Sequence, residues 1–373
     1  MNIAFDAKRL FNNFTGLGNH SRTTIDILTR WFPQNNYFLY TPKIKHCDAT
    51  TRYLNLDGCI VRTPGKGQIG ALWRTFGEID MMKKDRIDIF HGLSHEIPVG
   101  LHKAGIKSVV TIHDTAFKTF TDMYHWNDIL IYDLKFKYSC KNSDRIIAIS
   151  ENTKRDIMNF YNVPEEKIDV VYQPVNDIYY TPISKESARK ALSADIPDEY
   201  LLYVGSVNSR KNLLSIIKAI ELLPQDLQIP LIIIGNGREY KQKVLEYISK
   251  HHIDKNIIWA GTTDLNMLQA YYTCAKAFIY PSFYEGFGLP VVEAMLCGTP
   301  VISSTVSSLP EAAGPSSLLI DPNSVEELSN AISQVLTDEQ LRNQMITDGI
   351  KYANTMFNPQ KLANKLIETY DKL

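Results

Sequence analysis

The sequence has little of what marks several large protein classes. Its five cysteines are odd in number, widely scattered and without a CxxC pair, so neither a disulfide framework nor a zinc knuckle is indicated. No apolar run approaches the length of a bilayer span, and the start, MNIAFDAKRL, lacks the apolar core of a signal peptide. A net charge of −1 gives no nucleic-acid footprint. We therefore expect a cytoplasmic protein with reduced thiols and, at most, peripheral membrane contact.

Several catalytic motifs are absent as well. Neither a GxxxxGK[ST] phosphate loop nor a GxSxG elbow occurs, which disfavours kinases, P-loop ATPases and α/β-hydrolases. No DxD metal-nucleotide signal lies near an expected strand end, and His91, His95 and His113 lack a metal-ligand spacing. We therefore expect no metal site.

Short Val/Ile/Leu-rich runs alternate with helical patterns along the 373 residues, which indicates parallel sheets buried on both faces and joined by right-handed crossovers. The expected strands are 2–5, 37–40, 59–61, 87–90, 108–112, 145–149 and 169–172, then 201–204, 231–234, 257–259, 277–280, 301–303 and 318–320. QPVNDIYYTPIS at 173–184 holds two prolines and no helical period, so it separates the two series. We predict two doubly wound, Rossmann-like α/β domains.

The stretch PSFYEGFGLPVVEAMLCGTP at 281–300 carries the strongest chemical signal. Pro290 and Gly298 frame a helix of about two turns, since proline favours the first helical position and glycine the position past the end. The helix is apolar nearly all round, so it should be buried, and the Glu293 carboxylate within it needs a hydrogen-bonding partner. The N–H groups at its start need an acceptor. A ligand with hydroxyls and a negative charge would meet both needs.

In open α/β sheets, ligands bind beyond the carboxyl ends of the strands, and two further segments lie there. The turn GSVNSRKN at 205–212 carries Arg210 and Lys211 before an expected helix, where a diphosphate would gain from both cations. Without an anion, two cations oppose the helix dipole, and a solvated basic turn is the alternative. His113 ends another strand and is either a catalytic or sugar-binding group or a structural histidine.

The segment TGLGNH at 15–20 precedes the expected helix 21–31 and resembles a phosphate-cradling turn through Gly16 and Gly18. The alternative is a loop that needs positive φ angles. A different segment, 73–86, interleaves Trp73 and Phe76 with basic residues. It suits either a membrane-surface helix or a helix with one face in the core and the other in solvent.

Taken together, these residues resemble the retaining glycosyltransferases of the GT-B fold, specifically family 4. Glu285-GFGLPVV-Glu293 is similar to the family's E-x7-E block. The basic turn 205–212 and Ser308-Leu309-Pro310-Glu311 add to the resemblance, which covers nearly the whole chain. FTGLGNHS is a variant of the family's TGIGRYT turn, with Asn19 and His20 in place of arginine and tyrosine.

The resemblance implies a role for each part of the chain. Residues 1–178, joined by a C-terminal helix 358–373 that crosses back, would bind the acceptor, and residues 179–357 would bind the nucleotide sugar. Glu293 would bind ribose hydroxyls, and Arg210 and Lys211 would neutralise the diphosphate. Glu285 would contact the donor sugar near the reacting carbon, and His113 would face the transferred sugar. The remaining donor contacts would be Ser206, Gly235, Thr262, Gly286, Phe287, Gly288, Leu289, Gly16 and Gly18.

The implied reaction is metal-independent, retaining transfer of a sugar to a saccharide or lipid-linked acceptor in cell-surface polysaccharide synthesis. The nucleotide-diphosphate sugar is a co-substrate, and no cofactor is expected. The TGxG and SSLPE variants suggest GDP-mannose as donor, with UDP-glucose as an alternative. Other hypotheses are a nucleotide-sugar epimerase, a non-catalytic sugar-nucleotide-binding subunit and an NAD-dependent dehydrogenase. The last would need a third glycine after Gly16-Leu17-Gly18.

Overall fold

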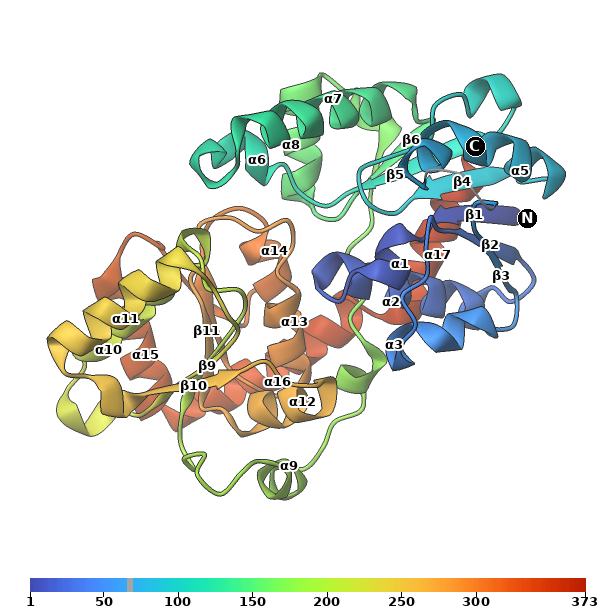
Figure 1. The fold of residues 1–373 in the computed structure, drawn as a ribbon. Coiled ribbons are helices and arrows are strands. Elements are labelled where there is room, and N and C mark those ends of the chain that lie inside the picture. Colours follow the sequence, from blue (N-terminus) through green and yellow to red (C-terminus); the bar gives the residue numbers. More distant parts are fainter. Residues whose placement is uncertain (66–69) are drawn as a thin grey trace. The chain divides into compact units, whose positions relative to one another are not determined.

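The computed structural model describes residues 1–65 and 70–373, which form two α/β units (Figure 1). Unit 1 comprises Met1–Pro174 and Phe357–Leu373, and unit 2 comprises Val175–Met356. The predicted pair of doubly wound parallel sheets is confirmed, and the described residues form seven strands in one sheet and six in the other. The chain passes from unit 1 to unit 2 between residues 174 and 175, a few residues before the predicted domain boundary at 178.

Unit 1 is built on a parallel sheet of order β3-β2-β1-β4-β5-β6-β7. Its strands are β1 (Asn2–Asp6), β2 (Asn36–Tyr40), β3 (Cys59–Arg62), β4 (Ile89–Gly92), β5 (Lys107–Ile112), β6 (Arg145–Ala148) and β7 (Ile168–Val170). Its helices are α1 (Lys8–Asn12), α2 (Gly16–Trp31), α3 (Asp48–Thr51), α4 (Gly70–Leu72), α5 (Glu78–Lys84), α6 (Ala116–Thr119), α7 (Trp126–Asn142), α8 (Glu151–Tyr161) and α17 (Pro359–Asp371).

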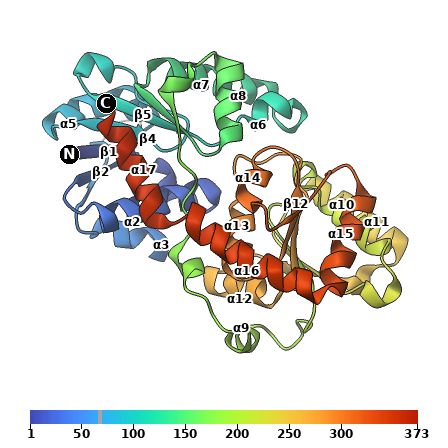
Figure 2. The ribbon, with the colours of Figure 1, turned by 180° about the vertical axis from the view of Figure 1, so that it is seen from behind.

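The side chains of successive β1 residues lie on opposite faces of this sheet, as they do in any β-strand. Ile3 and Phe5 lie in the core cluster beneath α1, α2 and α17, whereas Ala4 lies in the cluster beneath α5, α7 and α8. Helix α17, the last of the chain, packs beside α2 (Figure 2). Its Tyr370 hydroxyl lies 2.7 Å from Nδ1 of His91 on β4. The C-terminal helix therefore belongs to the core of unit 1.

Unit 2 is built on a parallel sheet of order β10-β9-β8-β11-β12-β13. Its strands are β8 (Leu201–Val204), β9 (Leu231–Ile234), β10 (Ile257–Gly261), β11 (Ala277–Tyr280), β12 (Val301–Ser304) and β13 (Leu318–Ile320). Its helices are α9 (Lys185–Ala191), α10 (Leu213–Glu221), α11 (Glu239–His251), α12 (Leu265–Cys274), α13 (Leu289–Leu296), α14 (Leu309–Ala313), α15 (Val325–Thr337) and α16 (Glu339–Met356). Helices α10, α11 and α15 pack on one face, and α13 contacts β11, α12 and α16.

Each sheet has one position where the direction of winding reverses. In unit 1 this switch lies between β1 and β4, and in unit 2 it lies between β8 and β11. The loops that follow the two central strands diverge there to opposite faces of the sheet, and they leave a crevice at the carboxyl edge. The topology therefore selects the loops after β8 and β11, and those after β1 and β4, as candidate sites.

Candidate functional site

The switch of unit 2 brings together the two segments that the sequence singled out. Gly205 through Asn212 follow β8, and Pro281 through Glu285 follow β11, so that both leave neighbouring strands at the same edge. The loops are tied by backbone hydrogen bonding, since the Phe283 amide donates to the Arg210 carbonyl at 2.8 Å. Gly235 follows β9, and the exposed Thr262 follows β10 at the edge of the sheet.

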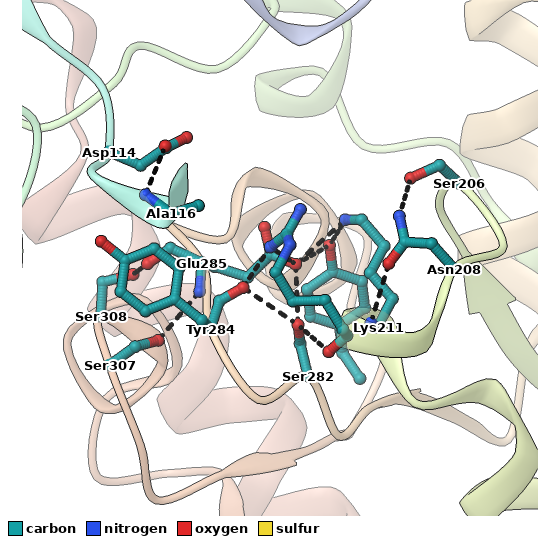
Figure 3. Close-up of polar contacts among 12 residues, drawn as sticks. Asp114, Ala116, Ser206, Asn208, Lys211, Ser282, Tyr284, Glu285, Ser307 and Ser308 are labelled. Carbon is teal, nitrogen blue, oxygen red and sulfur yellow. Dashed lines mark hydrogen bonds and ion pairs between the residues drawn. The ribbon is translucent and has the colours of Figure 1, made fainter. Parts of the chain in front are cut away.

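Glu285 is the centre of a compact ionic cluster (Figure 3). Its Oε1 atom lies 3.1 Å from Nη1 of Arg210 and 3.1 Å from Nζ of Lys211. Oε1 also accepts hydrogen bonds from the Tyr280 hydroxyl at 3.1 Å and the Ser282 hydroxyl at 2.9 Å. The side chains of Glu285, Arg210 and Lys211 are only 12%, 19% and 11% exposed. The cluster is therefore largely shielded from water, but part of its surface remains accessible to solvent.

The charges of this cluster determine its protonation. Burial alone would raise the pKa of Glu285, but the Lys211 and Arg210 cations lower it to about 2. Burial lowers the pKa of Lys211, and Glu285 opposes that effect. Glu285 is thus a carboxylate at physiological pH and holds no proton to donate.

The basic turn between β8 and α10 is itself a short helical turn. Ser209–Lys211 form a single 3₁₀ turn capped by Asn208, whose side chain accepts from the Lys211 amide at 3.1 Å. Asn212 then adopts a left-handed conformation, with φ of 58°, and α10 begins at Leu213. The cations therefore lie in the turn between β8 and α10, and the anion that they require is supplied from within the protein by Glu285.

Two serines of the SSLPE motif hold the loop that carries Glu285 through hydrogen bonds to its backbone. The Ser308 hydroxyl lies 2.7 Å from the Glu285 carbonyl and 2.9 Å from that of Phe287, and the Glu285 amide donates to Ser307 Oγ at 3.0 Å. Sequence reasoning used this motif for the resemblance but gave its serines no role. It also missed Tyr280 and Ser282, because no pattern links these residue types to a carboxylate.

Helix α13 begins and ends as the sequence predicted. Gly288 is its N-cap at φ of 111°, Pro290 lies in its first turn, and Gly298 follows its end at φ of 74°. The positive φ of Gly288 favours glycine, and a Cβ atom there would also lie 2.9 Å from the end of the Leu309 side chain. The backbone N–H groups of Gly288 and Leu289 lie at the start of the helix, where the helix itself offers no carbonyl acceptor.

Glu293, on the same helix, finds its partner on α12. The Tyr272 hydroxyl donates to Oε2 of Glu293 at 3.1 Å. Burial raises the pKa of Glu293 to about 7, and the bond from Tyr272 opposes this shift only in part. The two glutamates of the block are therefore electrostatically different, because Glu285 has two cations and Glu293 has one neutral hydroxyl.

Two glycines allow the loops after β8 and β9 to pass close to each other. Gly205 and Gly235 have φ angles of 153° and 147°. A Cβ atom at Gly235 would lie 1.8 Å from the Gly205 carbonyl oxygen. Gly235 is thus required by the backbone itself, whatever ligand lies beside it.

His113 follows β5 in unit 1 and is 3% exposed. Its Nε2 lies 2.8 Å from the Leu93 carbonyl, so Nε2 carries the hydrogen, and its Nδ1 accepts from the Gln173 amide at 2.8 Å. Burial lowers the pKa of His113 to about 4. With both ring nitrogens engaged and the ring neutral, the geometry favours positioning over proton transfer.

Gly16 and Gly18 lie inside α2, which begins at Gly16 rather than at the expected Ser21. Neither glycine has a positive φ, so the loop alternative is wrong. Gly18 is instead required by close approach, since a Cβ atom there would lie 1.8 Å from the Asn13 carbonyl oxygen. The TGLG segment therefore presents the start of a helix at the carboxyl end of β1, near the switch of unit 1.

Comparisons with known families agree over both units. The family described as Glycosyl transferases group 1 matches residues 184–352, and Glycosyltransferase Family 4 matches residues 28–177. The O-antigen chain mannosyltransferase B of Escherichia coli is 31% identical over 290 residues, which cover 76% of this chain and 74% of that protein. The O-antigen chain mannosyltransferase RfbU of Salmonella typhimurium is 27% identical over 61% of this chain and 60% of its own.

Solved structures show the same fold. Anabaena Alr3699/HepE in complex with UDP aligns over 100% of both chains, with a TM-score of 0.76 and 18% identity. WaaG, a glycosyltransferase involved in lipopolysaccharide biosynthesis, aligns over 97% of this chain and 98% of its own, with a TM-score of 0.73 and 18% identity.

Proposed function

The chain belongs to the group 1 glycosyltransferases of family 4, and on that premise we propose that it transfers a hexose from a nucleotide-diphosphate sugar to a saccharide acceptor. The observation that carries the donor site is the convergence of Arg210 and Lys211 on Glu285 at the switch of unit 2. Two fixed cations at one point suit a diphosphate, which would replace the carboxylate as their main counterion. Transfer with retention of the anomeric configuration is part of this proposal.

The chemistry follows from the charges. The bond between the anomeric carbon and the diphosphate oxygen breaks, the new glycosidic bond forms to the acceptor oxygen, and the acceptor hydroxyl loses its proton. Negative charge develops on the diphosphate, where preorganised cations are most effective. With a pKa of about 2, Glu285 is a weak base that accepts hydrogen bonds from donor-sugar hydroxyls and stabilises positive charge on the sugar ring. The departing diphosphate oxygen is then the stronger base for the acceptor proton.

We assign Glu293 to the ribose of the donor. An ionised carboxylate can accept hydrogen bonds from two neighbouring hydroxyls, and these bonds would offset the cost of burying its charge. The amides of Gly288 and Leu289, at the start of the same helix, would face the phosphates or the sugar. Ser206, Gly235 and Thr262 lie on the loops that would border the rest of the nucleotide.

Donor affinity should therefore depend on pH through Glu293. Its pKa is about 7, and the ligand binds the ionised form, so affinity for GDP and UDP should rise with pH. Below the pKa, the slope should be about tenfold per pH unit. Glu293→Gln should bind weakly at every pH, and isothermal titration across the range measures both. Tyr272→Phe is a matched control, since it removes one bond to Glu293 and should move the profile to higher pH. A flat wild-type profile would contradict this assignment.

The same pKa makes a prediction for stability. A raised folded-state pKa of a carboxyl group means that stability falls as pH rises from the unfolded-state value of 4.5 toward about 7. Glu293→Gln should therefore melt at a higher temperature than the wild type above that range and show no gain near pH 4. Calorimetry across the pH range separates this effect from ligand binding.

The donor we propose is GDP-mannose. Two of the relatives, at 31% and 27% identity, are O-antigen chain mannosyltransferases, whereas the Anabaena structure contains UDP. Thermal shift with GDP-mannose, GDP, UDP-glucose and UDP decides between them, because bound ligand raises the melting temperature by mass action. Incubation with the preferred donor alone, followed by NMR, tests the epimerase alternative, which predicts an epimer without any acceptor. Binding without turnover across an acceptor panel would instead favour a non-catalytic subunit.

Peripheral membrane contact, which a lipid-linked acceptor would require, is supported by α7. Among the described residues, no helix has the length and hydropathy to cross a membrane. On α7, however, Trp126, Leu130 and Leu134 are 73%, 53% and 59% exposed at a spacing of four residues, and the exposed Lys137 and Lys141 extend this face. Such a face suits an anionic lipid surface. In the segment 73–86, by contrast, Trp73 and Met82 lie in the core.

Trp126→Ala/Leu130→Asp should weaken sedimentation with vesicles of phosphatidylethanolamine and phosphatidylglycerol several-fold, because apolar contact is lost and negative charge is added. Activity on a soluble acceptor should be unchanged. Leu222→Asp, which alters a 56% exposed leucine of unit 2, is the matched control. Equal sedimentation of all three proteins would contradict membrane contact through α7.

A further inference from the structure

Unit 1 contains a pocket of about 220 Å³ that lies between α7 and the π-helical turn Trp73–Gly77. One part of its wall is apolar and is formed by Ile97, Pro98, Val99, Leu134 and Tyr138. Another part is polar and includes Asp6 at the end of β1, Arg74, Glu78 and Glu96. Asp6 ends β1 and Glu96 follows β4, the two strands at which the winding of this sheet reverses.

The polar wall is built around Arg74. Its Nη2 lies 2.7 Å from Oδ2 of Asp6 and 2.7 Å from Oε2 of Glu96. The Lys8 amide donates to Oδ1 of Asp6 at 3.1 Å, and Nζ of Lys135 lies 3.0 Å from Oε1 of Glu96. Arg74 and Asp6 are 14% and 3% exposed. The carboxylates and the guanidinium are therefore held in fixed positions by one another.

Glu78, one turn beyond Arg74, is different. Its side chain is completely buried, and neither carboxyl oxygen has a hydrogen-bond partner among the described residues. Burial and then the Asp6 charge raise the pKa of Glu78 well above its usual range, against a smaller effect of Arg74. Its carboxyl group thus has unused hydrogen-bonding capacity beside a pocket, and its raised pKa favours the neutral acid, which can both donate and accept. Buried groups of this kind are normally satisfied, so a partner is missing.

The wall determines which ligand chemistry fits. Two carboxylates, Asp6 and Glu96, balance the charges of Arg74 and Lys135, so that the wall offers a phosphate no net positive charge. A purely apolar chain would leave Glu78 unsatisfied. A molecule with C–H faces and several hydroxyls satisfies both walls, because the faces pack on the apolar side chains and the hydroxyls bond to the carboxyl groups. The volume suits one ring rather than a larger ligand.

We propose that this pocket binds one sugar residue of the acceptor and that Glu78 exchanges hydrogen bonds with a hydroxyl of that residue. That the bound sugar belongs to the acceptor rests on the proposed function. The pocket itself lies within unit 1 and is independent of the donor site in unit 2. The sugar, and not a phosphate of a lipid-linked acceptor, enters the pocket. Glu78 and Asp6 are accordingly specificity-determining residues rather than catalytic ones.

The test uses the full-length protein and ligand-observed NMR with the methyl glycosides of mannose, glucose, galactose and N-acetylglucosamine. At least one glycoside should bind the wild type. Glu78→Leu should weaken that binding at least tenfold, and Glu78→Gln, which keeps a neutral donor and acceptor, should stay within about threefold. Glu78→Leu should fold at least as stably as the wild type, because it removes an unsatisfied buried group. Affinity for GDP and UDP should be unchanged in both variants.

A second variant does not touch the carboxyl cluster. Leu134→Trp, at the 59% exposed rim of the pocket, should narrow it and weaken the same glycoside with normal nucleotide affinity. Glycoside binding that survives both Glu78→Leu and Leu134→Trp would overturn the proposal, as would a wild type that binds none of the glycosides. Binding of farnesyl phosphate to the wild type that Leu134→Trp weakens, with no glycoside bound, would also overturn it in favour of a lipid chain. The protein could also bind a glycoside through Glu78 and yet consume no nucleotide sugar. That result would refute the proposed function but support the assignment of the pocket as a sugar site.

Discussion

Replacing Arg210 and Lys211 together with alanine is expected to lower kcat/KM by about 10²- to 10⁴-fold and to abolish the thermal shift produced by nucleoside diphosphates. Each cation would supply a charge-assisted hydrogen bond of about 1.5–3 kcal/mol to the diphosphate, so the pair accounts for about 3–6 kcal/mol. Part of the loss should fall on kcat, since the leaving group carries more negative charge in the transition state than in the bound donor. Steady-state kinetics and titration with GDP and UDP measure the two parts.

The double variant leaves the Glu285 carboxylate buried beside neither cation, and we expect this to lower the stability of the fold. The triple variant, with Glu285→Gln added, removes the whole charge cluster and should regain thermal stability while remaining inactive. Lys276→Ala is the matched control. This lysine pairs with Glu199 at 2.6 Å just before β11, at the opposite edge of the same sheet, and its loss should leave activity unchanged. Normal diphosphate affinity in the double variant would refute the role of the turn.

Glu285→Gln is expected to lower kcat by about 10²-fold with no loss of nucleoside diphosphate affinity. The substitution removes a negative charge near the reacting carbon but keeps the shape of the side chain. It also deprives Arg210 and Lys211 of their internal counterion, so GDP or UDP should bind as well as before or more tightly. Glu293→Gln should show the opposite division, with weakened binding and a smaller effect on turnover.

The pH dependence provides an independent check of this assignment. With both cations facing it in the free protein, Glu285 has a pKa of about 2 and stays ionised throughout the working range, so kcat/KM should show no acidic limb from this group. Because the pKa is lowered in the folded state, the stability that Glu285 contributes is complete above the unfolded-state value of 4.5 and is lost as pH falls toward 2. A variant that loses affinity and turnover in parallel would contradict the division of roles between the two glutamates.

The strongest sequence inferences were those in which local chemistry leaves few alternatives. Pro290 and Gly298 marked the ends of α13 because each residue type has a strong positional preference at helix ends. The start of α2 was placed at Ser21 instead of Gly16, because glycine suggests a turn when its neighbours in space are unknown. Gly18 is needed to clear Asn13, and no local pattern contains that contact.

Contacts between residues that are distant in the sequence could not be predicted from the sequence alone. His113 was a candidate catalytic group as a histidine at a strand end, and only the fold shows that Leu93 and Gln173 occupy its ring nitrogens. Glu78 sits in a segment that reads as an ordinary amphipathic helix. Its lack of a partner appears only when β1, β4 and α7 surround it.

The sequence by itself determined two parallel α/β sheets, the helix carrying Glu293 and the presence of two adjacent cations at a strand end, because these depend on periodicity and local backbone preference. Only the tertiary structure decided how the charges pair. Arg210 and Glu285 lie far apart in the chain and meet because β8 and β11 are neighbours at the switch of the sheet. That pairing, together with burial, separates a glutamate with a pKa of about 2 from one with a pKa of about 7 eight residues away. Electrostatic environment is a property of what surrounds a residue, and the chain supplies those surroundings only once it is folded.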